Sequence, residues 1–269
     1  MIPRRLLLFL LPVIFAPADS SAQPNASGAI IVSGDLTREF SLQSGGSAEG
    51  RILLHNPGST PSRARIYQTD YQVDANGPVY GDAGQSPRSN ARWIEIDERE
   101  PELQPGETRS ILFKITAPAD STLRGTYWSM LMVEPFLDER PHKPGEISVR
   151  AVVRYGIQVV SQLGSSSAVT QPGLSNQTIE RSNGKNILRF DLSNSGERLL
   201  RPRLEVRLFD HEGRAIITLP PGHTRVYPGS SVRQRFPLTG LPPGEYLALI
   251  VMDTDDALFG AQYRFQLED

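Results

Sequence analysis

The residues that most often mark acid–base, nucleophilic or metal sites form no recognisable motif in this sequence. No His-x-His or similar spacing groups the four histidines, each of which stands beside turn residues: His55, His142, His211 and His223. The chain holds no cysteine and no Gly-x-Ser-x-Gly elbow, so the usual nucleophile signals are missing. We therefore expect neither an enzyme, a metal site nor a cofactor.

One short acidic stretch leaves an alternative open. Asp253, Asp255 and Asp256 in MDTDDALFG have the oxygen chemistry of calcium ligands, but the stretch lacks the spacing of a complete calcium loop. We interpret it as a solvated turn.

Charge composition excludes one class of partner. Lysine and arginine number 28 against 30 aspartates and glutamates, a formal net charge of −2. A nucleic-acid-binding protein needs a basic stripe, and none is present. We therefore expect no nucleic-acid partner.

The N-terminus predicts export. MIPRR is basic, LLLFLLPVIFAPA is apolar, and Ser20, Ser21 and Ala22 supply the small residues of a cleavage site. A membrane anchor is the alternative, but Pro12 and Pro17 interrupt the run, which falls short of the roughly 20 residues of a spanning helix. We predict a cleaved signal peptide over residues 1–22 and no stable membrane insertion afterwards.

The elements that must position any binding site are strands. Runs of five to eight β-branched and aromatic residues alternate with glycine- and proline-rich turns, and no long stretch has helical periodicity. We predict an all-β protein of two immunoglobulin-like β-sandwich domains in tandem.

An internal repeat supports two related domains. Turn-forming or strand-starting landmarks recur in the same order in both halves of the chain, paired as Asn56 with Asn194, Gly77 with Gly213, Gly106 with Gly229 and Tyr127 with Tyr246. The first copy carries about 13 extra residues before Trp93, which we expect to form a loop. GSSSAVTQPG, residues 164–173, has the composition of a linker, so we place the domains at 23–163 and 164–269.

Two strands have unusual patterns. EISVRAVVRYGIQVV, residues 146–160, alternates strictly and is about twice the usual strand length. Such a strand either pairs along its whole length or projects beyond its sheet and offers unpaired backbone to a partner.

The second unusual strand is LRGTYWSMLMVEP, residues 123–135, which is apolar on both faces. We therefore expect another part of the protein or a partner to cover the face of Trp128, Met130 and Met132.

The first domain resembles the N-terminal immunoglobulin-like domain of the periplasmic pilus-assembly chaperones of chaperone/usher systems. The resemblance is carried by Thr37-Arg38-Glu39-Phe40, GRILLHN, Ala91-Arg92-Trp93-Ile94 as a Trp-Ile strand, LQPGETRSILFKI, GTYWSMLMVEP and Val153-Arg154-Tyr155. The second domain is similar only in being immunoglobulin-like.

The resemblance implies a periplasmic chaperone that lends its long strand to an incomplete pilin-like or surface subunit, with an outer-membrane usher as a further partner. Arg38 and Arg154 would then anchor the carboxylate of the subunit. The donor residues would be Ile147, Val149, Ala151 and Val153, and Trp128, Met130 and Met132 would form an adaptable partner surface.

The alternative is a secreted or surface-associated structural or adhesion protein of two such domains. In that protein, Trp128, Met130 and Met132 are simply buried against the second domain or the opposing sheet, which is the commonest fate of such side chains.

Overall fold

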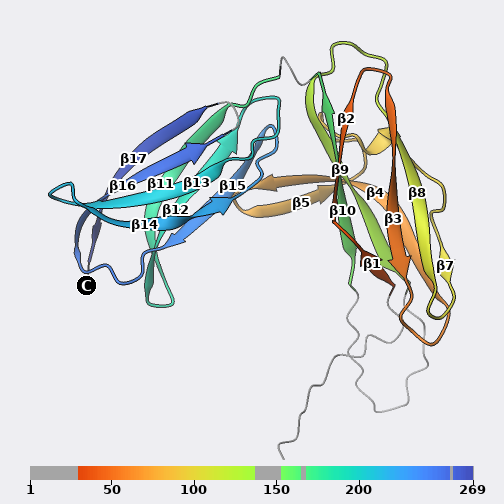
Figure 1. Cartoon of the computed structure of the whole chain (residues 1–269), viewed down its shortest axis with the longest axis horizontal. Helices are drawn as coiled ribbons and strands as arrows, with labels where there is room; N and C mark the ends of the chain where they lie inside the picture. Colours follow the sequence, from red (N-terminus) through yellow and green to blue (C-terminus); the bar gives the residue numbers. More distant parts are fainter. Residues whose placement is uncertain (1–29, 137–152, 165–167, 255–256, 269) are drawn as a thin grey trace, which may run out of the picture.

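The computed structural model describes residues 30–136, 153–164, 168–254 and 257–268. The predicted signal peptide lies outside these residues. The strands form two β-sandwiches in tandem, which confirms the predicted fold class (Figure 1). Within the described residues, no helix has the length and apolar character needed to cross a bilayer.

The first sandwich packs two sheets against each other. One sheet contains, in order, β1 (Ile31–Ser33), β3 (Ser47–His55), β8 (Thr108–Thr116) and β6 (Ile94–Ile96). The other contains β2 (Thr37–Leu42), β10 (Tyr155–Leu163), β9 (Gly125–Pro135), β4 (Ser62–Asp74) and β5 (Gly77–Gly81), with β7 (Glu102–Leu103) beside β4. The chain changes sheets at its start, because β1 pairs antiparallel with β3 whereas β2 pairs parallel with β10.

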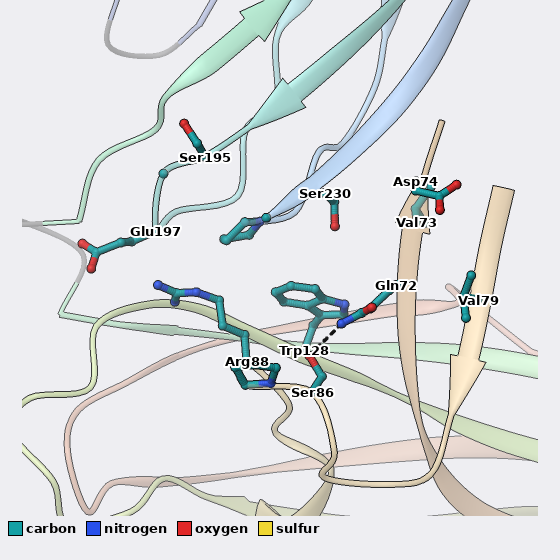
Figure 2. A pocket seen from close by; sticks show the side chains of 14 residues that line it. Gln72, Val73, Asp74, Val79, Ser86, Arg88, Trp128, Ser195, Glu197 and Ser230 are labelled. Atoms are coloured by element: carbon teal, nitrogen blue, oxygen red, sulfur yellow. Dashed lines mark hydrogen bonds between the residues drawn. The ribbon is translucent and has the colours of Figure 1, made fainter. Parts of the chain in front are cut away.

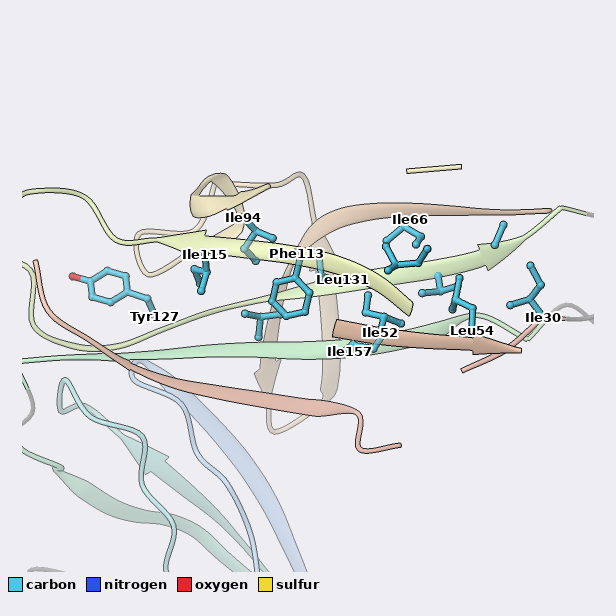
Figure 3. Packing of buried hydrophobic residues seen from close by; sticks show 14 of the residues in the cluster. Ile30, Ile52, Leu54, Ile66, Ile94, Phe113, Ile115, Tyr127, Leu131 and Ile157 are labelled. Atoms are coloured by element: carbon cyan, nitrogen blue, oxygen red, sulfur yellow. The ribbon is translucent and has the colours of Figure 1, made fainter. Parts of the chain in front are cut away.

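Alternation builds the core between these sheets. In β8, Ile111, Phe113 and Ile115 are buried while their neighbours face solvent. Figure 3 shows Phe113 and Ile115 of this row in one cluster with Leu131 of β9 and Ile157 of β10. Because successive residues of a strand point to opposite faces, the pattern that predicted the strands also defines this core.

The second sandwich has its own core. Its three-stranded sheet contains β11 (Pro172–Ser182), β12 (Lys185–Asn194) and β15 (Ser230–Pro237). Its four-stranded sheet contains β14 (Ala215–His223), β13 (Arg203–Asp210), β16 (Gly244–Asp253) and β17 (Leu258–Leu267). The apolar side chains between them come from residues 174–267, separate from the first core at 30–163.

The repeat predicted from Asn56 and Asn194 is confirmed in hydrogen-bond detail. Each side-chain amide donates to the carbonyl four residues ahead and to one more distant carbonyl, of Leu103 and of Val226 respectively. Each side-chain carbonyl accepts the amide N–H two residues ahead. Each backbone carbonyl accepts from the paired landmark glycine, Gly106 or Gly229, whose φ angles are 73° and 72°. The two asparagines thus do the same structural task in each sandwich.

The inserted stretch before Trp93 forms a loop only after Gly81, because its first residues belong to β5, which pairs with β4. The Trp-Ile strand also begins later than expected. Residues 91–93 form a short 3₁₀ helix, η1 (Ala91–Trp93), and β6 begins at Ile94. The buried carboxylate of Asp70 holds the loop by accepting from the N–H groups of Gly84 and Ser86 and from the Ser89 hydroxyl. These bonds satisfy a charge that would otherwise be costly to bury.

The predicted linker is partly integrated into the second sandwich. Val169 accepts from the N–H of Glu197 at 2.9 Å, and Gln171 accepts from that of Ser195 at 2.9 Å. Residues 165–167 lie outside the described chain. The boundary at residue 164 remains a proposal.

A buried ion pair in the second sandwich predicts acid sensitivity. Both Asp191 oxygens accept from the Arg233 guanidinium, at 2.8 and 3.1 Å, and this pairing lowers the pKa of the Asp191 carboxyl. A carboxyl whose pKa is depressed by folding stabilises the protein above its unfolded pKa, and that stability is lost as pH falls through the folded pKa. We expect the stability advantage of wild type over Asp191→Asn to be present at pH 7 and to disappear on acidification below the ordinary aspartate range. Urea unfolding at several pH values measures it. Asp82→Asn, which removes an exposed carboxylate, is the matched control, and an advantage that persisted unchanged at pH 2 would contradict this account.

Candidate functional site

One edge of β10 is open over the first residues of the strand. β10 pairs with β9 from Tyr155 to Leu163, but with β2 only from Gln158 to Leu163. The N–H of Gln158 donates to the carbonyl of Leu36, so the contact with β2 begins there. Within the described residues, positions 155–157 therefore have a strand neighbour on one side only.

The apolar face of this strand also continues past its own core. Ile157 is 1% exposed, Tyr155 is half-buried, and Val153 is 52% exposed. These three side chains share a face because they are two residues apart. Of the predicted donor residues, Ile147, Val149 and Ala151 lie outside the described residues, and Val153 is an exposed apolar side chain at the end of the open edge.

The structure does not bring Arg38 and Arg154 together. Arg38 lies opposite Val159 in the register, and Arg154 precedes Val159 by five residues, roughly 17 Å along an extended strand. The Arg38 guanidinium donates to the carbonyls of Asp35 and Thr37, whereas Arg154 pairs with the Glu134 carboxylate at 2.7 Å. No single carboxylate is held between them in this arrangement.

The second domain covers part of the apolar face of β9. Trp128 is 3% exposed; its ring stacks on Tyr227 at a centroid distance of 4.5 Å, and its Nε1–H donates to the Tyr71 carbonyl. Leu199 belongs to the same buried cluster. Burial against the second domain, the alternative interpretation of Trp128, is what the structure shows for this side chain.

The two methionines differ from Trp128 and from each other. Met130 is buried, and its thioether lies over Gly156 of β10, where an added Cβ would be 2.4 Å from its sulfur. Met132 is half-buried, with Tyr67 and Gly156 as its register neighbours. Of the three predicted partner-surface residues, Met132 keeps the most exposure toward a partner.

Polar contacts fix the second domain against β9. The N–H of Thr126 donates to the Glu197 carbonyl at 2.8 Å, and the N–H of Leu199 donates to the Thr126 hydroxyl at 2.7 Å. Gly125, at φ 83°, allows this approach, since a Cβ there would lie 2.1 Å from the Glu197 carbonyl oxygen. Arg124 pairs with the Glu197 carboxylate at 2.8 Å.

A crevice of about 470 Å³ lies between the domains beside Trp128 (Figure 2). Figure 2 shows the β4–β5 hairpin on one side and the segment carrying Ser195 and Glu197 on the other. The guanidinium of Arg88, which lines this crevice, donates to the carbonyls of Arg124 and Thr126. Nearby, burial raises the pKa of the Tyr227 hydroxyl, which donates to the Gln158 side chain at 3.1 Å. The hydrogen bonds of Arg88 thus lie within the first sandwich, whereas the bond from Tyr227 to Gln158 joins the two domains.

A second hollow, of about 480 Å³, was not anticipated from the sequence. It is lined by Arg201, Pro202, His223, Thr224 and Arg225 of the second sandwich. Arg201 and Arg225 both contact Glu39 of β2. No motif marks these residues, because the cluster forms only when the two domains meet.

The remaining polar candidates are scattered. His55 bonds to the Thr108 hydroxyl, His211 lies beside Glu212, and His142 lies outside the described residues, as do Asp255 and Asp256. Among the residues that the structure describes, no group of three or more histidine, aspartate or glutamate side chains could hold a metal ion.

Comparison with known proteins shows similarity of fold only. No family model and no curated protein matches the sequence. Similar solved structures include the CsuC-CsuE chaperone-tip adhesion subunit pre-assembly complex of Acinetobacter baumannii Csu pili, at 13% identity over 88% of this chain and 98% of that one, with a TM-score of 0.43. The class 5 fimbriae chaperone CfaA is 12% identical over 89% and 99% of the two chains, with a TM-score of 0.45. The Escherichia coli chaperone DraB is 12% identical over 90% and 98%, with a TM-score of 0.41. At this identity, the similarity to chaperones of fimbrial assembly is one of fold and assigns no partner to this chain.

Proposed function

We propose that this protein is a periplasmic, non-enzymatic chaperone that binds an extended segment of a pilin-like or surface subunit along the open edge of β10. The observation that supports this proposal most directly is the way the start of β10 extends beyond its sandwich. Among the residues that the structure describes, the backbone of β10 has a strand neighbour on one side only over residues 155–157, and its apolar face becomes exposed toward Val153.

Both features favour strand addition. A partner strand would gain main-chain hydrogen bonds from the open edge, and side-chain pockets would select its sequence. By alternation with Gln158, whose N–H faces β2, the N–H and carbonyl of Gly156 face the open side. An open edge is also an aggregation risk, so an obligatory partner explains why it is kept.

The sequence pattern supports a longer binding strand. Ile147, Val149 and Ala151 continue the alternation of Val153 and Tyr155, although their structure is not described. Export by the predicted signal peptide would place the protein where such subunits are assembled. The proposal does not require Arg38 and Arg154 to hold the same carboxylate.

We expect Val153→Asp to abolish subunit binding, because it places a charge on the apolar face that a partner strand would cover. Tagged protein is recovered from the native envelope, and retained proteins are identified by mass spectrometry. Wild type should retain a small β-rich subunit that the variant loses.

Val79→Asp is the matched control. Val79 is 55% exposed on β5, the opposite edge strand of the same sheet, so the substitution changes charge and exposure in the same way away from β10. If both variants retain the subunit equally, β10 does not bind it. If wild type retains no subunit, the proposal is rejected.

The second candidate is a structural or adhesion module. The burial of Trp128 against Tyr227 favours it, because that contact explains the apolar face of β9 without a partner. A wild-type protein that retains no envelope subunit but binds a surface would support this function.

A further inference from the structure

We propose that β17 pairs with β17 of a second copy of this chain, antiparallel about a two-fold axis, to form a dimer through the second sandwich. β17 is an edge strand, because among the described residues it pairs with β16 and with no other strand. Figure 1 shows it at the outer boundary of the second sandwich, away from the first. This surface plays no part in the proposed function.

β17 lacks the features by which proteins protect an edge strand from pairing, namely prolines, bulges and several charges. Its ten residues pair with β16 without a register shift, contain no proline and include one charged side chain, Arg264. β14, the opposite edge of the same sheet, contains Pro220 and Pro221, and its pairing with β13 shifts register twice. The sheet is thus protected at one edge and open to strand addition at the other.

Apolar side chains are exposed on both faces of this edge. Leu258 is 72% exposed on the outer face of the sheet, where Val251 of the neighbouring β16 is half-buried. Phe259 is 37% exposed, although it shares the core face with Phe265 and Leu267, which are buried. Exposed apolar side chains along an unprotected edge mark a surface suited to a further strand.

The sequence of β17 suits pairing with its own copy. A two-fold axis perpendicular to the sheet must place one residue opposite itself, because any other register would oppose side chains from different faces. With Gln262 on the axis, Phe259 lies opposite Phe265 of the second copy, and Arg264 lies opposite Gly260. The aromatic pair is a favourable cross-strand contact, and the only charge of the strand meets no like charge. A second copy thus covers the exposed Phe259 without opposing like charges.

The dimer would join two four-stranded sheets into one continuous sheet and leave the open edge of β10 free in each copy. Pairing along one strand buries little surface compared with an obligate dimer, so we expect reversible association in the micromolar range. Dimerisation and subunit binding are therefore separable by mutation.

Sedimentation velocity of the purified protein from about 1 to about 300 μM tests the association. We expect a reversible shift from monomer to dimer in wild type, weakened at least about tenfold in Gln262→Lys. Because Gln262 is exposed, the substitution should leave the fold unchanged, but it places like charges opposite each other on the axis. Thr218→Lys, at an exposed position of β14, is the matched control and should dimerise as wild type.

A single cysteine reports the register directly, since the chain has none of its own. In an antiparallel pair, the Cα atoms of opposed residues are about 4.5–5.5 Å apart, within the range that a disulfide spans. Gln262→Cys should therefore form a disulfide-linked dimer when oxidised with diamide, whereas Thr218→Cys should stay unlinked at the same concentration. Equal linkage of both variants, or a dimer that Gln262→Lys does not weaken, would place the contact elsewhere and overturn pairing through β17.

Val153→Asp separates the dimer from the proposed function. It should dimerise as wild type, because β10 is not part of the contact; loss of the dimer would place the interface at β10 and overturn pairing through β17. Gln262→Lys should in turn retain the envelope subunit as wild type does, and loss of the subunit would assign the β17 edge to that partner instead. A wild-type protein that stays monomeric over the whole concentration range would overturn the dimer while leaving strand addition at β10 in place.

Discussion

Replacing Trp128 by alanine is expected to lower the free energy of unfolding by about 3–5 kcal/mol. Trp128 is almost fully buried between the domains, so the change removes a large apolar side chain and leaves a cavity beside Tyr227 and Leu199. The Tyr71 carbonyl also loses the indole N–H as its partner. A buried acceptor left without a donor adds its own cost.

The loss should fall on the coupling between domains. Each sandwich has a separate core, and Trp128 belongs to the small cluster that joins them. We therefore expect wild type to unfold in one transition and Trp128→Ala to unfold in two. Circular dichroism during urea unfolding and calorimetry during thermal unfolding measure the number of transitions. Tyr227→Phe keeps the ring and loses only the bond to Gln158, so it should cost about 1 kcal/mol. A single transition at the wild-type midpoint for Trp128→Ala would show that the cluster does not couple the domains.

The strands and turns were predictable because their causes are local. Alternation in β8 follows from the residues themselves, and landmark glycines such as Gly106 occupy positive φ angles that other residues avoid. The start of β6 was not predictable, since the N–H of Trp93 bonds to the Asn90 carbonyl and turns Ala91–Trp93 into a 3₁₀ helix. That hydrogen bond competes with strand formation, and no distinctive residue composition marks it in the sequence.

The interface between the domains has no such local signature. The pattern of β9 showed that Trp128 needed cover, but Tyr227 and Leu199 come from turns of the second sandwich that carry no shared motif. The cation cluster is equally hidden, because Glu39 and Arg225 meet only through the domain arrangement. The strand register explains why Arg38 and Arg154 lie apart. Arg38 pairs with Val159 rather than with Arg154, and each residue of offset along a strand adds about 3.3 Å to the separation.

Asn56→Ala should destabilise the first sandwich by about 2–4 kcal/mol, the second large effect we expect. The fully buried Asn56 side chain makes three hydrogen bonds, to the carbonyls of Thr60 and Leu103 and from the N–H of Gly58. Alanine leaves these groups without their partner, and the buried Leu103 carbonyl has little access to water as a replacement. Unfolding in denaturant, followed by amide exchange, measures both the size and the place of the loss.

The equivalent change in the other copy, Asn194→Ala, is the internal control. Because Asn194 makes the same bonds around Gly196, Arg198 and Val226, the loss should be similar in size but should raise exchange in the second sandwich. If the domains are coupled through Trp128, each substitution lowers the midpoint of the whole chain; in a Trp128→Ala background, each should lower only its own transition. Exchange that rises equally in both sandwiches for both variants would show that the two asparagines do not act as separate, repeated anchors.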